Sequence, residues 1–272
     1  DFGKLKLDEC YVDIGAKDRE TALKAVAVGD TLIYDSPCFT NQGKVVSPYL
    51  DNRISCAILL KVLEEMELVD RAACVLGIGC CGLHMDYIAY DNTTAPHGRA
   101  CAVATGMKRS NPDSLVFTYQ GDGDFASIGL AESISAANRG ENITVIFINN
   151  GIYGMTGGQM APTTLVGMKA STAPHGRYPK EHGYPMHMCE ILNQLTAPAY
   201  LVRTSCNTPA NVNKTKQAIH KAFQNQLDGK GFSMVEIVTS CPTNWGLDPM
   251  KSLEHIEEKM LPEFPLGVVR DR

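Results

Sequence analysis

The chain has 272 residues and a mass of 29.5 kDa, which is long enough for one or two domains with a substantial buried core. Apolar residues make up 44% of it and charged residues 20%, a balance that excludes a largely disordered chain. The net charge of -5 argues against a nucleic-acid-binding protein, because such proteins usually present a basic face to phosphates.

The sequence gives no indication of a membrane anchor. The densest apolar stretch, residues 56–63, contains Lys61 and is far shorter than a membrane-spanning helix. Residues 1–9 contain no long apolar core followed by small residues, so we expect no signal peptide. Ten cysteines without a Cys-x-x-Cys pair are typical of buried thiols in a reducing compartment. These features predict a cytoplasmic protein.

The sequence changes character near Glu67. Before this point, short alternating segments separated by turn signals predict antiparallel strands, and residues 54–66 predict an amphipathic helix. We therefore expect a short β-rich region over residues 1–66 and a second domain over residues 67–272. The alternating segments are residues 10–14 and 31–34, and the turn signals are residues 29–30 and 42–43.

After residue 70, strand patterns alternate with helical patterns, which predicts a mostly parallel sheet flanked by helices. The uninterrupted apolar run at residues 143–148 is typical of a strand covered on both faces. Residues 151–177 are rich in Gly and Thr and lack periodicity, which favours a functional loop. The predicted strands are residues 114–119, 143–148, 199–203 and 232–238, and the predicted helices are residues 125–139, 210–226 and 249–260.

Two polar motifs follow two consecutive predicted strands. Gly121-Asp122-Gly123-Asp124 comes after the first strand, and Asn149-Asn150 ends the next. Gly-rich turns at the carboxyl ends of parallel strands let backbone N–H groups approach phosphates, and Mg²⁺ prefers oxygen ligands such as carboxylates. Each motif alone is also compatible with an ordinary tight turn. Together they predict that Asp122 and Asn150 share one magnesium ion that bridges a diphosphate.

This pairing resembles the diphosphate signature of thiamine-dependent enzymes. Residues 67–272 further resemble the beta subunit of 2-oxoacid:ferredoxin oxidoreductases, particularly the 2-oxoglutarate and branched-chain types. The resemblance implies an α/β thiamine-diphosphate-binding fold with a mostly parallel sheet flanked by helices, preceded by the short β-rich segment. The matching stretches are residues 97–100, 102–106, 117–124, 137–147, 152–164 and 241–246.

The same resemblance implies roles for individual residues. Magnesium would be held by the side chains of Asp122 and Asn150 and by the backbone carbonyl of Ile152. His97 would lie near the thiazolium ring as a catalytic residue, although alone it would be interpreted as a capped loop histidine. The other implied cofactor-binding residues are Gly121, Gly123 and Asp124 in the diphosphate turn, and Thr156 and Gln159 as polar contacts in the loop of residues 154–164.

The activity that the resemblance implies is oxidative decarboxylation of 2-oxoacids to acyl-coenzyme A. Ferredoxin would accept the electrons, and a partner alpha subunit would supply a glutamate that activates thiamine diphosphate. The chain would thus be one part of a hetero-oligomer, inactive without its alpha partner, with neither nucleic acid nor membrane as a partner.

An iron–sulfur cluster needs four thiolates, and the family takes two of them from an N-terminal Cys-x-x-Cys. Here Cys80 and Cys241 fit the other two positions, with Cys81 as an alternative to Cys80. We therefore expect a [4Fe-4S] site that lacks two of its ligands. Buried apolar positions are expected for Cys74, Cys101, Cys189 and Cys206, and the spacing of Cys10, Cys38 and Cys56 is wrong for the missing pair.

Residues 1–66 instead resemble part of a dinuclear-zinc peptidase of the glutamyl aminopeptidase type, through residues 11–16, 28–30 and 50–53. In that family the residue matching Asp51 bridges two zinc ions, but the histidine ligands and the glutamate base have no counterparts, so we interpret Asp51 as a loop carboxylate. The chain resembles a chimera. Two alternative functions are a metallo-aminopeptidase and a catalytically idle assembly subunit.

Overall fold

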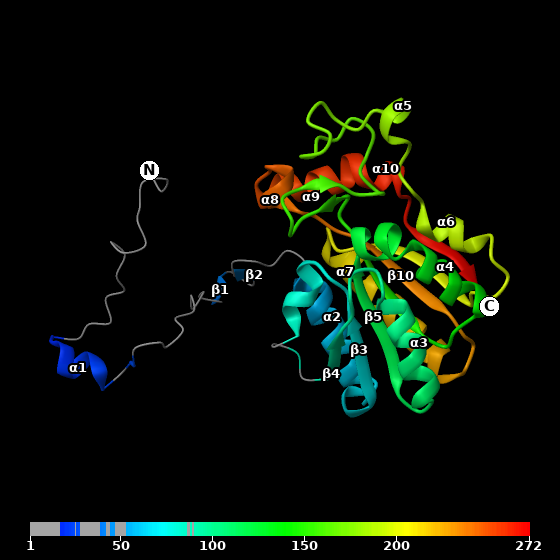
Figure 1. Cartoon of the computed structure of the whole chain (residues 1–272), viewed down its shortest axis with the longest axis horizontal. Helices are drawn as coiled ribbons and strands as arrows, with labels where there is room; N and C mark the ends of the chain where they lie inside the picture. Colours follow the sequence, from blue (N-terminus) through cyan, green and yellow to red (C-terminus); the bar gives the residue numbers. More distant parts are fainter. Residues whose placement is uncertain are drawn as a thin grey trace. The chain divides into compact units, whose positions relative to one another are not determined.

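A computed structural model describes the chain in two compact units, Asp1–Pro48 and Tyr49–Arg272 (Figure 1). In the first unit, α1 (Arg19–Leu23) is a short helix that begins after Asp18, whose carboxylate accepts a hydrogen bond from the backbone of Thr21. The described residues of the whole chain are 17–24, 26–27, 39–41, 44–46, 53–85, 88 and 90–272.

The first unit also contains a hairpin in which β1 (Phe39–Asn41) pairs antiparallel with β2 (Lys44–Val46). This pairing agrees with the antiparallel strands predicted around the turn signal at residues 42–43. The strands predicted at residues 10–14 and 31–34 lie outside the described residues, as do Cys10, Cys38 and Asp51.

The second unit is built on a seven-stranded sheet with the order β11-β9-β10-β6-β5-β3-β4. All neighbouring strands in it are parallel except β11, which runs antiparallel to β9. The mostly parallel sheet predicted from the sequence is therefore confirmed. The strands are β3 (Ala72–Leu76), β4 (Asp91–Thr94), β5 (Leu115–Gly121), β6 (Thr144–Asn149), β9 (Tyr200–Ser205), β10 (Ser233–Val238) and β11 (Gly267–Asp271).

Helices cover both faces of this sheet (Figure 1). One face packs against α2 (Arg53–Glu65) and α7 (Pro209–Leu227), the other against α3 (Ala100–Ser110), α4 (Leu130–Arg139) and α6 (Met188–Asn193). The predicted amphipathic helix at residues 54–66 is α2. Its apolar stripe is buried in the core of the Tyr49–Arg272 unit, through Ile58, Leu59, Val62 and Leu63.

Two predicted helices are interrupted in the structure. The helix expected at residues 125–139 begins with one π-helical turn, η5 (Asp124–Ile128), before α4. The π-turn ends where the backbone passes close to another loop: a Cβ on Gly129 would lie 2.6 Å from the carbonyl oxygen of Gly98. The helix expected at residues 249–260 is likewise α9 (Pro249–His255) followed by a π-turn, η6 (Ile256–Met260). Such turns are frequent at functional sites.

The remaining elements are short or lack a strong periodic pattern, and the sequence reasoning did not predict them. The strand β4 has the polar sequence Asp-Asn-Thr-Thr, and β11 is an exposed edge strand, so neither shows a buried-strand pattern. The other short elements are η3 (Val69–Arg71), η4 (Cys80–His84), β7 (Ile152–Tyr153), β8 (Gln159–Met160), α5 (Pro179–His182), α8 (Pro242–Trp245) and α10 (Leu261–Glu263).

The chain reverses its direction across the sheet at β3, which has β4 on one side and β5 on the other. In open α/β sheets, ligands bind beyond the carboxyl ends of the strands at such a switch point. The loops that leave β3 and β5 begin at Gly77 and Asp122, so this edge is where a site is expected. Among the described residues, none of the helices is both long enough and apolar enough to cross a bilayer.

Candidate functional site

The turn that follows β5 places one carboxylate in a buried position. Asp122 is 3% exposed. Its Oδ1 accepts a hydrogen bond from the backbone N–H of Gly123 at 2.8 Å, and its Oδ2 accepts from the hydroxyl of Thr163 at 3.0 Å. A Cβ on Gly121 would meet no atom within 4 Å, so open space lies beside the backbone at the end of β5.

The end of the neighbouring strand β6 brings an amide oxygen to the same place. The backbone N–H of Ile152 lies 3.2 Å from Oδ2 of Asp122 and 3.3 Å from Oδ1 of Asn150. The two oxygens therefore converge on one N–H. The indole N–H of Trp245 donates to the carbonyl oxygen of Asn150 at 3.2 Å and supports the turn. The structure thus brings together the three residues that the sequence reasoning assigned to magnesium.

The electrostatics of Asp122 favour a nearby positive charge. Burial raises the pKa of this carboxyl to about 6, although hydrogen bonds from Thr163 and from backbone N–H groups lower it. A divalent cation would offset the cost of burying the carboxylate. Among the described residues, no three His, Cys, Asp or Glu side chains form a metal-binding group, so a cation here would have one carboxylate and neutral oxygens. That donor set fits Mg²⁺, which often completes its shell with phosphate oxygens and water.

The second aspartate of the turn faces the protein interior. Both oxygens of Asp124 accept hydrogen bonds, Oδ1 from Nδ1 of His97 at 2.6 Å and from the backbone N–H of Gly98 at 2.8 Å, and Oδ2 from the side chain of Gln120 at 2.5 Å. The ring of His97 also contacts that of Tyr153 edge-on, with centroids 6.4 Å apart. Asp124 therefore shapes the site by hydrogen bonding to neighbouring loops of the chain.

The predicted polar contacts in the long loop bond to each other. The hydroxyl of Thr156 donates to Oε1 of Gln159 at 2.6 Å, and Nε2 of Gln159 donates to the carbonyl oxygen of Thr156 at 2.9 Å. Thr156 is exposed and Gln159 is partly exposed, and each keeps further hydrogen-bonding capacity for a ligand beside this pair.

Two functional residues in this loop were missed by the sequence reasoning. Thr163 is fully buried and donates to Asp122, and only its place directly after Pro162 in the matching stretch could have drawn attention to it. Arg177 is 5% exposed and holds the loop together, which an arginine in a Gly-rich aperiodic stretch could have indicated. Its guanidinium donates to the backbone carbonyls of Ala161, Pro162, Thr164, His182, Gly183 and Tyr184.

The two cysteines assigned to a cluster border the same loop. A Cβ on Gly154 would lie 3.3 Å from the sulfur of Cys241 and 3.7 Å from that of Cys80. The thiol of Cys81 instead faces the interior, where it donates to the carbonyl of Gly77, and burial raises its pKa to about 12. The geometry therefore favours Cys80 over Cys81 as a metal ligand, because a ligand must be a thiolate.

The four cysteines expected as filler lie inside the fold. Cys74, Cys101 and Cys189 are buried, and Cys206 is partly buried, as is Cys56 on α2. Burial raises the pKa of all four thiols, to about 12 for Cys101 and Cys206. These positions agree with the expected role as buried filler.

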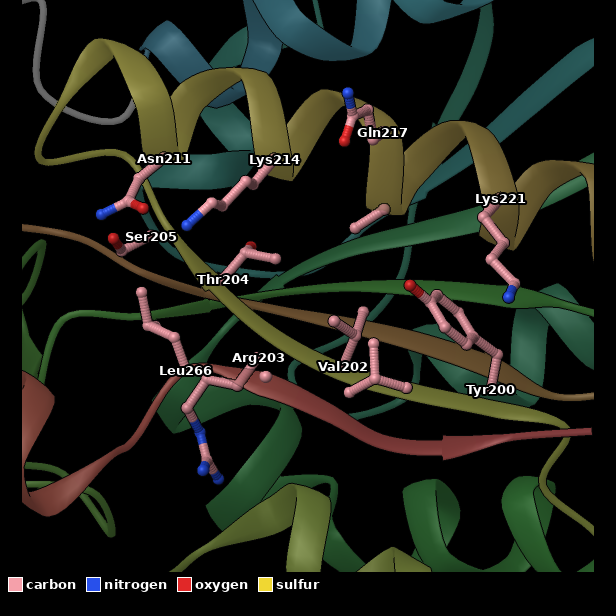
Figure 2. Close-up of a pocket in the computed structure, with 13 residues that line it drawn as sticks. Tyr200, Val202, Arg203, Thr204, Ser205, Asn211, Lys214, Gln217, Lys221 and Leu266 are labelled. Atoms are coloured by element: carbon pink, nitrogen blue, oxygen red, sulfur yellow. The ribbon is translucent and has the colours of Figure 1, made fainter.

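A separate pocket of about 350 Å³ lies between α7 and β11, over β9 (Figure 2). It forms where the antiparallel edge strand leaves part of the sheet uncovered by the helix. Lys214 and Lys221 reach toward it from α7, and Lys221 pairs with Asp271. None of the predicted site residues lines this pocket. Its lining is Tyr200, Val202, Arg203, Thr204, Ser205, Asn211, Lys214, Gln217, Ala218, Lys221, Leu266, Gly267 and Val268.

Two family models match the chain in consecutive regions. Residues 77–237 match the C-terminal thiamine-pyrophosphate-binding domain of thiamine pyrophosphate enzymes, and residues 3–79 match the M42 glutamyl aminopeptidases. The first match covers more than half of the chain and contains the turn after β5, the end of β6 and the long loop. The second covers the region that the sequence reasoning identified as peptidase-like.

Curated relatives agree with the first match. The chain is 46% identical to the ketoisovalerate oxidoreductase subunit VorA of Methanothermobacter thermautotrophicus over 78% of its own length and 44% of that protein. It is 36% identical to the 2-oxoglutarate synthase subunit KorB of Archaeoglobus fulgidus, over 76% of its own length and 73% of that protein. The chain thus spans less than half of the first relative and most of the second.

A solved structure shares the fold. A 2-oxoglutarate:ferredoxin oxidoreductase from Magnetococcus marinus, with 2-oxoglutarate, coenzyme A and succinyl-CoA bound, superimposes with a TM-score of 0.65. The match covers 80% of this chain and 79% of that one, at 24% sequence identity. At this level of identity the likeness concerns the fold.

Proposed function

The chain belongs to the thiamine pyrophosphate enzymes, among the subunits of 2-oxoacid:ferredoxin oxidoreductases, and from this premise we propose its function. We propose that it is the subunit that binds thiamine diphosphate and Mg²⁺ in the oxidative decarboxylation of 2-oxoacids to acyl-coenzyme A. The observation that carries the proposal is the convergence of Asp122 Oδ2 and Asn150 Oδ1 on the N–H of Ile152.

Within this proposal, the chain's own residues bind and orient the cofactor. Asp122, Asn150 and the backbone carbonyl of Ile152 hold Mg²⁺, and Gly121 and Gly123 leave their backbone accessible to the diphosphate. The hydroxyl of Thr163 holds the Asp122 carboxylate in place. Bound thiamine diphosphate supplies an electron sink for loss of carbon dioxide.

The ligands for the iron–sulfur cluster that would carry the electrons are incomplete in this sequence. Cys80 and Cys241 border Gly154 and are the thiols that would hold an iron–sulfur cluster. A [4Fe-4S] cluster needs four ligands, and the sequence has no Cys-x-x-Cys to supply the other two. We propose that thiamine and magnesium binding are retained while cluster binding by this chain is impaired.

The proposed partners follow from the names of the relatives. Subunit names such as VorA and KorB are those of multi-subunit oxidoreductases, and the solved relative from Magnetococcus marinus binds 2-oxoglutarate and coenzyme A. We propose that this chain assembles with an alpha subunit, and that a 2-oxoacid, coenzyme A and ferredoxin are its reaction partners. Ferredoxin would accept electrons from the assembled complex.

The match to M42 peptidases supports a second candidate, a metallo-aminopeptidase. That family requires a dinuclear zinc site, and the sequence offers Asp51 without the histidine ligands. We therefore propose that residues 1–66 are a segment of peptidase ancestry without peptidase activity, joined to the thiamine-binding domain at residues 67–272. A catalytically idle assembly subunit is the third candidate.

A thermal-shift comparison tests the proposal. Thiamine diphosphate with Mg²⁺ at 100 times its Kd should stabilise the folded chain by about 2.7 kcal/mol, which corresponds to about 5–11 °C in Tm for a chain of this size. Zinc alone should produce no comparable shift and no release of N-terminal residues from peptides. A rise in Tm with zinc and none with thiamine diphosphate would favour the metallo-aminopeptidase over the thiamine-binding subunit.

Activity with an added alpha subunit distinguishes the third candidate. Normal cofactor binding with neither decarboxylation of a 2-oxoacid nor reduction of ferredoxin by the reconstituted complex would identify an idle assembly subunit. Reduction of ferredoxin at a rate dependent on a 2-oxoacid and coenzyme A would instead identify the oxidoreductase.

A further inference from the structure

A buried carboxylate next to the proposed magnesium site connects three loops. The side chain of Asp124 is fully buried. It accepts hydrogen bonds from Ile78 in the loop after β3, from His97 and Gly98 in the loop after β4, and from Gln120 on β5. The loops after β3 and β4, and the turn after β5 that contains Asp124, all leave the carboxyl edge of the sheet. The loop after β3 continues directly to Cys80.

The surroundings prevent this carboxylate from turning. A Cβ on Gly77 would lie 2.6 Å from Oδ2 of Asp124, so the missing side chain of Gly77 makes room for it. On the other oxygen, the backbone N–H groups of Gly98 and Ile78 donate at 2.8 and 3.2 Å. Since backbone donors have fixed directions, Oδ1 can only face the His97 loop.

This fixed acceptor decides where His97 carries its proton. A carboxylate accepts hydrogen bonds and does not donate them, and Nδ1 of His97 lies 2.6 Å from Oδ1 of Asp124. Nδ1 must therefore carry a hydrogen. A neutral imidazole has only one, so Nε2 is then an acceptor.

The ring of His97 is partly accessible. The side chain of His97 is 30% exposed, whereas that of Asp124 is completely covered, so the exposed surface of the ring lies away from its contact with Asp124. Among the hydrogen bonds of the described residues, that of His97 is made through Nδ1, which leaves Nε2 for a ligand. Open space beside Gly121, at the end of β5, leaves room for such a ligand.

We infer that Asp124 is a positioning residue that holds His97 in the tautomer protonated at Nδ1 and so presents Nε2 as an acceptor for an N–H or O–H group of the bound cofactor or substrate. The tautomer follows from the contacts of Asp124 alone. The identity of the ligand rests on the proposed function, in which thiamine diphosphate binds beside the end of β5.

The direct test is the tautomer of His97 in the wild-type chain. Nitrogen NMR of protein labelled with ¹⁵N-histidine, recorded at alkaline pH where imidazoles are neutral, distinguishes the protonated ring nitrogen from the bare one. The chain has seven histidines, and the signal of His97 is assigned by its loss in His97→Gln. We expect the proton on Nδ1; a proton on Nε2 overturns the inference without involving any cofactor.

Variants of Asp124 test whether this residue determines the tautomer of His97. Asp124→Asn retains an amide oxygen that can accept from Nδ1, so the tautomer should be preserved. Asp124→Ala removes the acceptor, and the proton should move predominantly to Nε2. Retention of the proton on Nδ1 in the alanine variant would refute the role of Asp124. Should the alanine variant not fold, the wild-type spectrum and the His97 variants still decide the question.

The acceptor role of Nε2 is tested by His97→Asn. The asparagine amide can still donate to Asp124 but has no atom at the position of Nε2. We expect the Kd for thiamine diphosphate, measured with saturating Mg²⁺, to rise about tenfold, the loss of one good hydrogen bond, with Tm unchanged. His220→Asn, at an exposed position of α7, is the matched control. A Kd within twofold of wild type in His97→Asn refutes the acceptor role.

The two inferences fail separately. If the wild-type chain binds no thiamine diphosphate, the proposed function is wrong, while the NMR result still reports the tautomer. If the wild-type chain binds thiamine diphosphate but His97 carries its proton on Nε2, only the positioning role of Asp124 is wrong.

Discussion

Two regions at the carboxyl edge of the same sheet differ in how their residues are gathered. The oxygen region, formed by Asp122, Asn150 and Ile152, draws on the ends of two adjacent strands, β5 and β6. The thiol region, formed by Cys80 and Cys241, joins the loop after β3 to the segment after β10 and has only two candidate ligands.

The difference shows which sites withstand a change of the N-terminal sequence. The residues of the oxygen region lie at or just after the ends of β5 and β6, and the residues that support them, Thr163 and Trp245, also lie within the Tyr49–Arg272 unit. A four-thiolate site, as expected from the sequence resemblance, would take two ligands from an N-terminal segment, and here the N-terminal residues match a peptidase family. Under the proposed function, the oxygen region is complete because its ligands are local in the fold, and the thiol region is incomplete because it depends on a distant segment.

Core packing depends less on the exact N-terminal sequence than a metal site does. The helix α2 falls within the peptidase-like match, yet its apolar stripe is buried in the core beside α7. A core accepts apolar side chains of about the right size from any source, whereas a metal site requires particular atoms at particular positions. The helix α2, which lies in the peptidase-like match, therefore packs as part of the core of the Tyr49–Arg272 unit.

The largest effect should come from the shared carboxylate of the oxygen region. Asp122→Asn keeps the shape of the side chain but removes the charge, and the affinity for thiamine diphosphate with Mg²⁺ should fall at least about 100-fold, or about 3 kcal/mol. Isothermal titration calorimetry measures the change. Asp113→Asn, on an exposed turn, is the matched control and should bind normally. Unchanged affinity in Asp122→Asn would show that Asp122 does not hold Mg²⁺, and the oxygen region would then no longer differ from the thiol region as a metal site.

A second effect concerns the close packing behind the oxygen region. Gly77→Ala would place a Cβ 2.6 Å from the buried carboxylate of Asp124. We expect a loss of about 1–3 kcal/mol in the free energy of unfolding, because the core must shift to accommodate it. Urea denaturation measures this loss. Gly106→Ala, on α3, would meet no atom within 4 Å and should be neutral or slightly stabilising.

A pH dependence follows from the buried carboxyl. Burial raises the pKa of Asp122 to about 6 in the chain without metal, so this group is protonated below that pH in the folded state. Because Mg²⁺ binds the carboxylate, its affinity should fall about tenfold for each pH unit below 6 and level off above 7. The folded chain without metal should correspondingly lose stability as the pH rises from about 4 to 6, since the raised pKa favours the protonated form. Affinity that does not change between pH 5 and 7 would contradict this.

The smallest effect should come from the thiol region. If its ligand set is incomplete, Cys241→Ser should change thiamine diphosphate affinity less than about twofold, because Cys241 is not among the residues proposed to hold the cofactor, and its sulfur accepts a hydrogen bond from Nδ2 of Asn244. Iron and acid-labile sulfide in the purified wild-type chain should fall well short of a four-iron cluster. A full complement of iron and sulfide, lost in Cys241→Ser, would show that the thiol region is complete after all.

Much of this fold could be predicted from periodicity. The apolar runs that became β5, β6, β9 and β10 are buried on both faces, which is why their patterns were visible. The strand β11 escaped prediction because it lies at the sheet edge with exposed residues such as Val268. The π-turn η5 was not predicted either, because helical periodicity does not distinguish a π-turn from an α-helix, and the close approach of Gly129 to Gly98 joins residues about thirty positions apart.

The sequence by itself determined which chemical groups stand at the strand ends: two carboxylates after β5, one amide after β6, and two candidate thiols for a cluster. Tertiary structure alone decided how these groups face. It turned Asp122 toward Asn150 and Asp124 toward His97, although the two aspartates are separated by a single glycine. The direction of a side chain in a turn depends on which backbone donors surround it, and those donors come from loops that the order of residues does not bring together.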